Sequence, residues 1–281
     1  MTVLVLSGLI LLGGVCAGLI GSLSGLGGGV VIVPLLTLVF GVDIRYAIGA
    51  SLVSGIATSS GAAAAYVREG FTNVRAGMFL EVATTAGALS AAAIAGLVPA
   101  TAIAVIFGLV LVSTVFVSLR GAEVVPEEEH ADRLATRLRL NGSYPERPGR
   151  ITRYFVQHVP GGFSLMFLAG VLSGLLGIGS GALKVVAMDM VMRMPLKVST
   201  TTSNFMIGVT AAASAGVYLH RGYIDPGLAM PVMLGVLVGS LVGARILPRV
   251  HTRYLRIIFE VVVFVLGVEM IFNGLTGRIG G

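Results

Sequence analysis

The sequence contains few of the residues that soluble proteins place at their surfaces. Charged side chains make up 11% of its 281 residues, whereas 56% are apolar, and the mean hydropathy is +0.97. A soluble domain carries about 25% charged residues. A disordered chain is rich in charge and poor in apolar residues. Both classes are therefore excluded, and the composition predicts a polytopic membrane protein surrounded by a lipid bilayer.

Side chains that carry catalysis or bind metals are also scarce. The chain has one cysteine, Cys16, so it cannot form an intrachain disulfide. Its four histidines lie in loops or at the ends of apolar runs, where they cannot form the buried Ser–His pair of an intramembrane hydrolase. No GxxxxGK[ST] phosphate-binding loop is present, which argues against an ATP-driven motor in this chain. We therefore expect a protein that is not an enzyme and uses no cofactor and no metal.

Apolar runs fill most of the chain, and most of them reach the ~20 residues that a spanning helix needs. They fall at about 3–23, 30–40, 46–67, 76–98, 100–119, 163–176, 182–192, 198–219, 227–247 and 254–273. Two runs, 30–40 and 182–192, hold 11 residues each and would extend only about 16 Å as helices. Each follows a glycine cluster, at 24–29 and 177–181. Glycine allows the backbone to turn, so we predict two helices that are broken within the membrane.

The two halves of the chain resemble each other. A shift of 152 positions superimposes six glycines, whereas about two coincidences are expected by chance. The glycine cluster 25–29 falls on 177–181, and Ser51 falls on Ser203. The two predicted breaks therefore occupy equivalent positions in a repeat.

The basic residues indicate the orientation in the membrane. If each break is the tip of a hairpin followed by three full crossings, 15 Lys and Arg fall on one side and three on the other, with Lys184 inside the membrane. Cytoplasmic loops are enriched in Lys and Arg, so both termini are expected to be extracytoplasmic. Three crossings are an odd number, so the second half enters from the opposite side and the repeat is inverted. The net charge of +6 thus reflects topology and predicts no nucleic-acid partner.

The predicted fold is an all-α polytopic protein of the cell (inner) membrane with two inverted-topology repeats, each a broken-helix hairpin followed by three spanning helices. The first repeat covers 1–119 and the second 161–281, and 120–160 forms a cytoplasmic linker. No Lys or Arg precedes the first apolar run, so 1–23 is expected to be a retained membrane helix and not a signal peptide. The linker contains seven Arg and six acidic residues.

Within the linker, the charge pattern from Pro126 to Arg139 predicts a short helix. Leu134 and Leu138 would give this helix a narrow apolar edge, so we expect the linker to lie on the membrane surface.

An inverted repeat with broken helices places its substrate near the bilayer midplane, where the two breaks meet. Half-helices that begin near Val30 and Ala182 would direct free N–H groups and partial positive charge to that point, which favours an anion. Hydroxyl and amide groups in 51–60 and 199–204 can replace water around an oxyanion, although Ser and Thr also pack membrane helices together. The residues predicted to bind the substrate are Ser24, Gly27, Gly28, Gly29, Ser51, Gly179, Ser180, Gly181, Lys184, Thr202, Ser203 and Asn204.

Ionisable residues inside spans are functional candidates by default. Lys184 lies one turn into the second half-helix, where it could bind the anion or pair with Asp189, five residues further on. Glu81, Asp189 and Glu260 are the acids most central to apolar runs and are candidates for proton coupling. For Asp189, a salt bridge is the alternative.

The residues around the two breaks resemble those of the sulfite exporter TauE/SafE family of membrane proteins. The first hairpin carries Gly25-Leu26-Gly27-Gly28-Gly29, followed by Ala47, Ser51 and Leu52; the second half carries Gly177-Ile178-Gly179-Ser180-Gly181 and Thr202-Ser203-Asn204-Phe205. The resemblance covers nearly the whole chain except 120–160. It implies a transporter of small sulfur-containing anions such as sulfite or organosulfonates, often in the export direction. The second repeat departs from the family pattern at Ser180 and Lys184, which bears on the anion that fits.

The leading hypothesis is therefore a secondary transporter of a small anion that works by alternating access around the two breaks. A passive anion channel and a membrane sensor or scaffold that transports nothing are the alternatives. The sequence leaves the anion, the coupling ion and the oligomeric state open.

Overall fold

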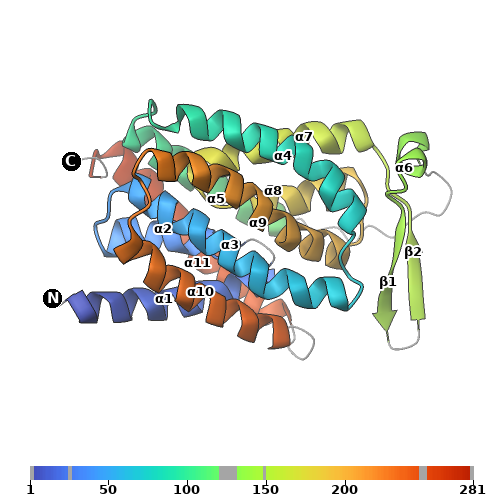
Figure 1. Cartoon of the computed structure of the whole chain (residues 1–281), viewed down its shortest axis with the longest axis horizontal. Helices are drawn as coiled ribbons and strands as arrows, with labels where there is room; N and C mark the ends of the chain where they lie inside the picture. The colour runs from blue at the N-terminus through green and yellow to red at the C-terminus, as the bar shows by residue number, and fades with distance from the viewer. Residues whose placement is uncertain (1–2, 25–26, 120–131, 148–149, 247–251, 279–281) are drawn as a thin grey trace.

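The computed structural model describes residues 3–24, 27–119, 132–147, 150–246 and 252–278. Its long helices run roughly along the long axis of the molecule (Figure 1). The first half contains α1 (Val3–Ser24), α2 (Gly29–Pro34), the π-helix η1 (Leu35–Val39), α3 (Ile44–Arg68), α4 (Val74–Ala95) and α5 (Ala100–Leu119). The second half contains α7 (Val159–Leu176), α8 (Gly181–Val186), the π-helix η2 (Ala187–Val191), α9 (Leu196–His220), α10 (Pro226–Ile246) and α11 (Thr252–Leu275).

Among the described residues, four helices are long and apolar enough to cross a membrane by length and composition. They are α1, α4, α7 and α10, over Val5–Ser22, Val74–Ala95, Val159–Leu176 and Pro226–Gly243. Large apolar side chains on these helices point outward: Leu12 is 61% exposed, Val82 66% and Leu168 55%. An apolar outer surface is what contact with lipid tails requires. The prediction of a helical, multi-pass membrane protein is confirmed at this level.

The two short apolar runs form half-helices that follow the glycine clusters. α2 with η1 spans Gly29–Val39, and α8 with η2 spans 181–191, close to the runs 30–40 and 182–192 expected from the sequence. Gly27, Gly177 and Gly179 adopt positive φ angles of +82°, +67° and +67° at the breaks. Glycine takes this conformation without the steric cost of a Cβ atom, so each glycine cluster turns the chain into its half-helix.

Glycines also bring the two halves of the chain into close contact, and they do so twice. A Cβ atom on Gly18 of α1 would collide with the carbonyl oxygen of Val236 on α10. A Cβ atom on Gly170 of α7 would collide with the carbonyl oxygen of Thr84 on α4. Under the shift of 152 positions, Gly18 becomes Gly170 and Thr84 becomes Val236. The same contact therefore occurs with the two halves exchanged.

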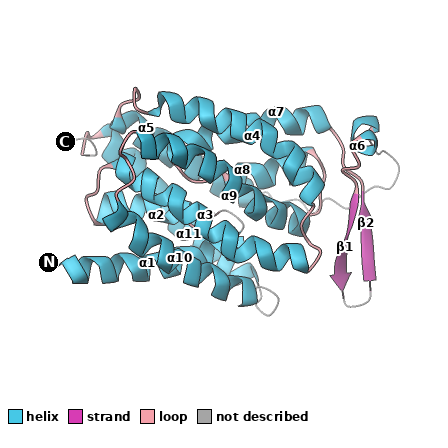
Figure 2. Ribbon diagram, in the orientation of Figure 1, coloured by secondary structure: helices cyan, strands magenta, loops and turns pink. Residues whose placement is uncertain are grey.

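A small folded unit lies between the halves, at one end of the helical bundle (Figure 2). We call residues 132–158 the linker unit; it contains α6 (Arg133–Arg137) and an antiparallel hairpin of β1 (Gly142–Arg147) and β2 (Arg150–Tyr154). Its buried side chains Ala135, Leu140, Tyr154 and Val156 join a core cluster with residues of α4, α7, η2 and α9. The linker unit thus packs onto the bundle.

One expectation for this segment needs correction, and one feature was not expected. The predicted helix through Pro126–Arg139 is limited to α6, because Arg139 has a positive φ of +53° and ends it; Pro126–Glu129 lies outside the described residues. Leu134 and Leu138, the expected apolar edge, are 37% and 38% exposed, and their contact with the membrane surface stays a prediction; Leu140 is buried. The hairpin was not expected, because its strands contain Pro145 and several Arg and lack alternating apolar residues.

Hydrogen bonds fix the linker unit to the start of α4. The Nδ2 atom of Asn73 donates to the carbonyl oxygen of Leu140 over 2.7 Å and to the hydroxyl oxygen of Tyr154 over 2.8 Å. The Oδ1 atom of Asn73 accepts the backbone N–H of Ala76, so the same side chain caps α4. Burial raises the pKa of Tyr154 to about 12, an effect that the hydrogen bond from Asn73 partly offsets.

We predict that Tyr154→Phe changes the pH dependence of stability. A raised pKa favours the folded state below pH 10, and this contribution is lost between pH 10 and about 12, because the unfolded chain loses the proton first. The variant loses one hydrogen bond, worth about 1 kcal/mol at neutral pH, and its melting temperature falls less steeply than the wild type above pH 10. Thermal unfolding in detergent measures both effects, with the exposed Tyr46→Phe as control. Parallel pH profiles for Tyr154→Phe and wild type would contradict the prediction.

Candidate functional site

The two glycine breaks meet inside the protein, as the sequence predicted. A Cβ atom on Gly29, at the start of α2, would lie 3.0 Å from the carbonyl oxygen of Gly177 and 3.3 Å from Cα of Ile178. Gly27, Gly28, Gly29, Gly179 and Gly181 are all buried. The side chain of Ser24 and all of Gly25 and Leu26 lie outside the described residues.

Ile207 of α9 lies against both breaks. Its Cδ1 atom is 3.3 Å from the position of a Cβ atom on Gly27, and its Cγ2 atom is 2.8 Å from that of a Cβ atom on Gly179. The side chain is 1% exposed. The point where the breaks meet is therefore lined by an apolar group as well as by backbone. Sequence reasoning missed Ile207, because an isoleucine in an apolar helix carries no signal that separates it from its neighbours.

Three serines expected at the site donate hydrogen bonds to backbone carbonyls around the breaks. Ser51 Oγ on α3 donates to the carbonyl oxygen of Gly177 over 2.7 Å. Ser203 Oγ on α9 donates to that of Gly181 over 3.1 Å. Ser180 Oγ donates to that of Ala169 on α7. These O–H groups thus hold the irregular backbone in place, and their oxygens retain the capacity to accept.

Thr202 and Asn204, the other two polar residues predicted in this cluster, have different surroundings. The Thr202 hydroxyl accepts the backbone N–H of Asn73 over 3.0 Å, which places it beneath the linker unit. Asn204 is fully buried, and neither its Oδ1 nor its Nδ2 atom has a hydrogen-bond partner among the described residues. Asn204 precedes Ile207 by three positions, so the two share a face of α9. An unpaired buried amide costs about 1–3 kcal/mol, and both amide atoms of Asn204 keep their capacity to form hydrogen bonds.

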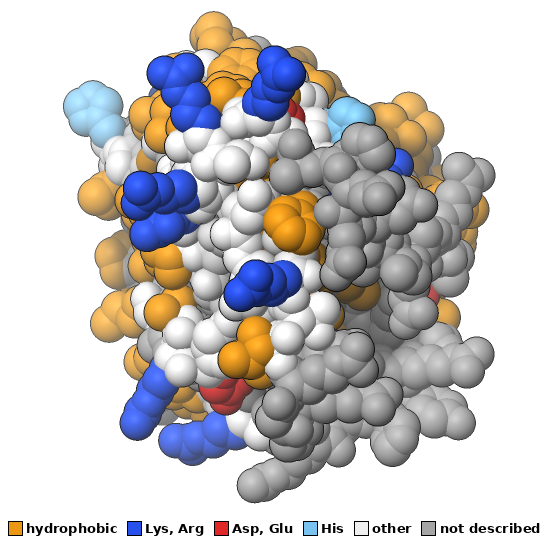
Figure 3. Space-filling view, turned by 90° about the vertical axis from the view of Figure 1, so that its right-hand side faces the viewer, with side chains coloured by type: hydrophobic (Ala, Val, Ile, Leu, Met, Phe, Trp, Pro, Cys, Tyr) orange, Lys and Arg blue, Asp and Glu red, His pale blue; other side chains and the backbone are white. Residues whose placement is uncertain are grey.

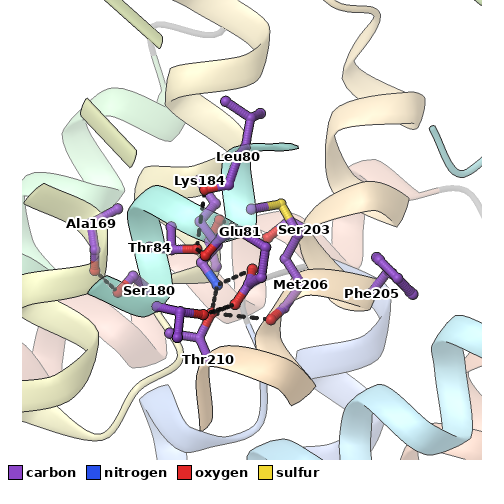
Figure 4. A network of polar contacts seen from close by, with 12 residues as sticks. Leu80, Glu81, Thr84, Ala169, Ser180, Lys184, Ser203, Phe205, Met206 and Thr210 are labelled. Carbon is purple, nitrogen blue, oxygen red and sulfur yellow. Dashed lines mark hydrogen bonds and ion pairs between the residues drawn. The ribbon is translucent and has the colours of Figure 1, made fainter. Parts of the chain in front are cut away.

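Lys184 is fully buried, and its nearest carboxylate is Glu81 on α4. Its Nζ atom donates to the Thr210 hydroxyl over 2.6 Å, and that hydroxyl lies 2.5 Å from Glu81 Oε1, to which it donates. Nζ is 3.9 Å from Glu81 Oε2. Thr85 also donates to Glu81 Oε1, over 3.0 Å. Figure 4 shows Glu81, Thr210 and Lys184 converging from three helices, so a threonine bridges this ion pair.

This geometry corrects the expected partner of Lys184. The sequence offered Asp189, five residues along the same segment, but the ion pair forms with Glu81, 103 positions earlier in the chain. The helix changes from α to π at Ala187, which alters the angular position of Asp189 relative to Lys184. Asp189 in η2 and Glu260 in α11 are each 7% exposed, and both make contacts of their own.

The Lys184–Thr210–Glu81 network exists in one half of the repeat only. The shift of 152 positions places Ile32, Thr58 and Met233 at the equivalent positions. Thr58 keeps the hydroxyl but donates it to the carbonyl oxygen of Ser54, over 2.9 Å. The other two positions are apolar. The site around the breaks is therefore chemically one-sided, with its charges on the side of α8.

Two arginines organise the opposite end of the bundle. Arg221 donates to the carbonyl oxygens of Ala92, over 3.1 Å, and Ala93, and so binds the C-terminus of α4. Arg45 donates to the carbonyl oxygen of Val98 over 3.3 Å and lies over the ring of Tyr223, 5.9 Å from its centroid. Cations at a helix C-terminus stabilise it. Within the described part of the chain, no group of three or more His, Cys, Asp or Glu is placed to hold a metal.

We predict that the breaks tolerate only small residues. Gly27→Val and Gly179→Val should abolish transport while membrane insertion persists, because valine resists a positive φ and its Cβ atom would press on Ile207. Gly222→Val is the matched control, since Gly222 has a φ of +73° and nothing within 4 Å of a Cβ atom. Uptake assays and membrane fractionation measure the two properties. Normal transport by the break variants would show that the breaks are not the site.

Comparison with known proteins places the chain in a family. The model of the family described as sulfite exporter TauE/SafE matches residues 10–270. Probable membrane transporter protein YunE of Bacillus subtilis is 28% identical over 270 residues, covering 93% of this chain and 96% of that protein. Sulfite exporter TauE/SafE family protein 1 of Arabidopsis thaliana is 34% identical over 106 residues, covering 38% of this chain and 23% of that protein.

A relative from an archaeon, probable membrane transporter protein MJ0441 of Methanocaldococcus jannaschii, is 22% identical and covers 95% of this chain and 96% of its own length. No solved structure is significantly similar to the chain. The match to the family model covers the described helices of both halves from within α1 to within α11. The chain is therefore a multi-pass membrane transporter and not an enzyme, and it belongs to the sulfite exporter TauE/SafE family.

Proposed function

We propose that this protein is a secondary transporter of a small sulfur-containing anion, of the sulfite or organosulfonate class, and that it works in export. The observation that carries the proposal is a fully buried cation, Lys184, in the half-helix that follows the second break. A charge at this depth is costly unless it serves a function or has a partner. Its partner Glu81 contacts it through Thr210 and at 3.9 Å, so the ammonium group keeps N–H donors that an anion could bind.

The break geometry and Asn204 support an oxyanion as the substrate. Asn204 presents an unpaired amide on the face of α9 that carries Ile207, and Ile207 lies against both breaks. An amide N–H and an ammonium group can both donate to sulfite or sulfonate oxygens. Ile207 would face the apolar part of an organosulfonate. The relatives in Arabidopsis are named for sulfite export, which agrees with this class.

The reciprocal contacts support an inverted repeat and alternating access. The contact of Gly18 with Val236 and that of Gly170 with Thr84 are related by exchange of the two halves. A repeat of this kind can form two units that move against each other around a fixed central site and expose it to each side in turn. Because α1 packs on α10 and α4 packs on α7, each moving unit would combine helices from both halves of the chain.

The ends of the bundle support the proposed orientation in the inner membrane. The start of α1 and the end of α11 lie at the end of the molecule opposite the linker unit (Figure 1). Lys and Arg side chains gather on the linker end (Figure 3). Exposed Arg75 and Arg193 belong to this end, because the nearby Asn73 and Met192 form hydrogen bonds with the linker unit. Cytoplasmic surfaces carry such a basic excess.

We predict opposite locations for the linker and the C-terminus. A reporter inserted at Gly142 should report the cytoplasm, and one fused after Gly281 should report the extracytoplasmic side, because of the basic excess around the linker. Alkaline phosphatase and fluorescent protein fusions distinguish the two compartments. Reporters on the same side would contradict both the orientation and the inverted repeat.

A ligand screen tests the substrate class. The purified protein is heated with sulfite, sulfate, thiosulfate, methanesulfonate or acetate, and a bound anion raises the melting temperature; saturation at 100 times Kd adds about 2.7 kcal/mol of stability. We expect sulfite or methanesulfonate to stabilise the wild type and not Lys184→Ala. Arg278→Ala, at the exposed end of the chain, is the control for loss of a positive charge.

The same anion is then followed in proteoliposomes. Accumulation against a gradient supports a secondary transporter, whereas flux that only dissipates the gradient indicates a passive channel. Loading the anion inside or outside the vesicles, with the orientation of the protein known, gives the direction. Absence of any stabilising anion would contradict the proposed function and favour a sensor or scaffold.

A further inference from the structure

We propose that Glu81 is a built-in counter-anion that the transported anion replaces at Lys184, and that Glu81 takes up a proton as it is replaced. One proton then travels in the same direction as each anion. This inference rests on the proposed function and adds the coupling ion. It follows from the way in which Lys184 and Glu81 leave each other incompletely bound.

The ammonium group of Lys184 has donors to spare. It carries three N–H groups, and one hydrogen bond is found among the described residues, to Thr210 at 2.6 Å. The distance of 3.9 Å to Glu81 Oε2 is an ion-pair contact but too long for a hydrogen bond. A buried ammonium group with unused donors is a binding group for an oxyanion.

The two carboxylate oxygens of Glu81 also differ in their hydrogen bonds. Its Oε1 atom accepts from Thr210 at 2.5 Å and from Thr85 at 3.0 Å. Its Oε2 atom is buried and has no hydrogen-bond partner among the described residues. Oε2 is therefore the atom that can receive a proton without displacing an existing donor. In the protonated carboxyl, the new O–H bond forms at Oε2 and both hydroxyl contacts to Oε1 can persist.

The charge balance requires this proton. With Glu81 ionised, the pair is neutral, as a low-dielectric interior demands. A monovalent anion at Lys184 would leave one uncompensated negative charge, and protonation of Glu81 removes it. When the anion leaves, Glu81 gives the proton back to water and pairs with Lys184 again. Every proton and charge is accounted for in this exchange, without another reactant.

Few other ionisable groups face Glu81. Helix α4 packs against α7, which contains no titratable side chain, and against α9, whose Lys197 and His220 are exposed near its two ends. The buried Tyr218 of α9 donates its hydroxyl to backbone carbonyls of α7. The half-helix beside α7 contributes Lys184 and Asp189. The equivalent positions in the other half are Ile32 and Met233, so the repeat supplies one such proton site and not two. We therefore infer a single coupled proton per anion.

Coupling of this kind fixes which ions move together, and the gradients fix the direction. Export proceeds when the outward anion gradient exceeds the opposing proton gradient. In vesicles, the flux should therefore reverse when the pH gradient is made large enough.

The test uses methanesulfonate, which stays ionised across the pH range, so any pH effect belongs to the protein. We expect wild-type affinity to fall about tenfold for each pH unit over which Glu81 is ionised in the free protein and protonated in the complex, as linkage to one proton requires. Glu81→Gln, which is permanently neutral, should show no such fall at acid and neutral pH, where Lys184 keeps its proton. In proteoliposomes it should still exchange internal for external anion, but a pH gradient should no longer drive accumulation. Glu269→Gln, at an exposed carboxylate of α11, is the control and should behave as wild type.

A double variant separates this role from a purely structural pair. Lys184→Met with Glu81→Leu removes both charges and should fold, but should bind no anion at any pH; restored transport would overturn the proposal. Equal pH dependence in wild type and Glu81→Gln, with the anion bound by both, would overturn the coupling and leave the proposed function standing. If neither methanesulfonate nor sulfite binds the wild type, the proposed function fails and the coupling fails with it.

Discussion

Backbone groups freed by a helix break inside a membrane find no water to bind, and this constraint shapes the centre of the protein. Hydroxyl groups from other segments supply the partners: Ser51 binds the carbonyl of Gly177, and Ser203 binds that of Gly181. Because Ser51 lies on α3 and Ser203 on α9, the breaks depend on these two helices. The central helices and the half-helices therefore form a single unit, and a displacement of α3 or α9 must alter the site.

Much of the fold could be predicted because the lack of water inside a membrane limits which local sequences can form spanning helices. A run of 11 apolar residues after a glycine cluster cannot span a bilayer, and both runs became half-helices. The linker unit could not be predicted in the same way. Its strands lack alternation, and its contacts, such as that of Asn73 with Tyr154, join segments 81 positions apart. Sequence patterns carry information about helix periodicity and little about such tertiary hydrogen bonds.

The residues of the candidate site also differ in whether local sequence or long-range contacts determine their role. The glycines of the breaks and the depth of Lys184 are local features, and the sequence indicated both. The partner of Lys184 is not local: Glu81 reaches it from α4, while the nearer Asp189 lies beyond the change to π-helix. Ile207 was missed because an apolar residue in an apolar helix cannot be distinguished from the others until its neighbours in the fold are known. A charged residue or a glycine can be recognised in a sequence, but the residue that contacts it in the fold cannot.

The close contacts between glycine and backbone also have a consequence for biosynthesis. Gly170 meets Thr84, 86 positions earlier, so α4 and α7 can pack while the second half is still being made. Gly18 meets Val236, 218 positions later, so α1 must wait for almost the whole chain. During that interval the face of α1 that later meets α10 lacks this partner. Helix α1 is thus among the last described helices to be locked in place, and a chain that stalls before α10 lacks the partner that holds α1.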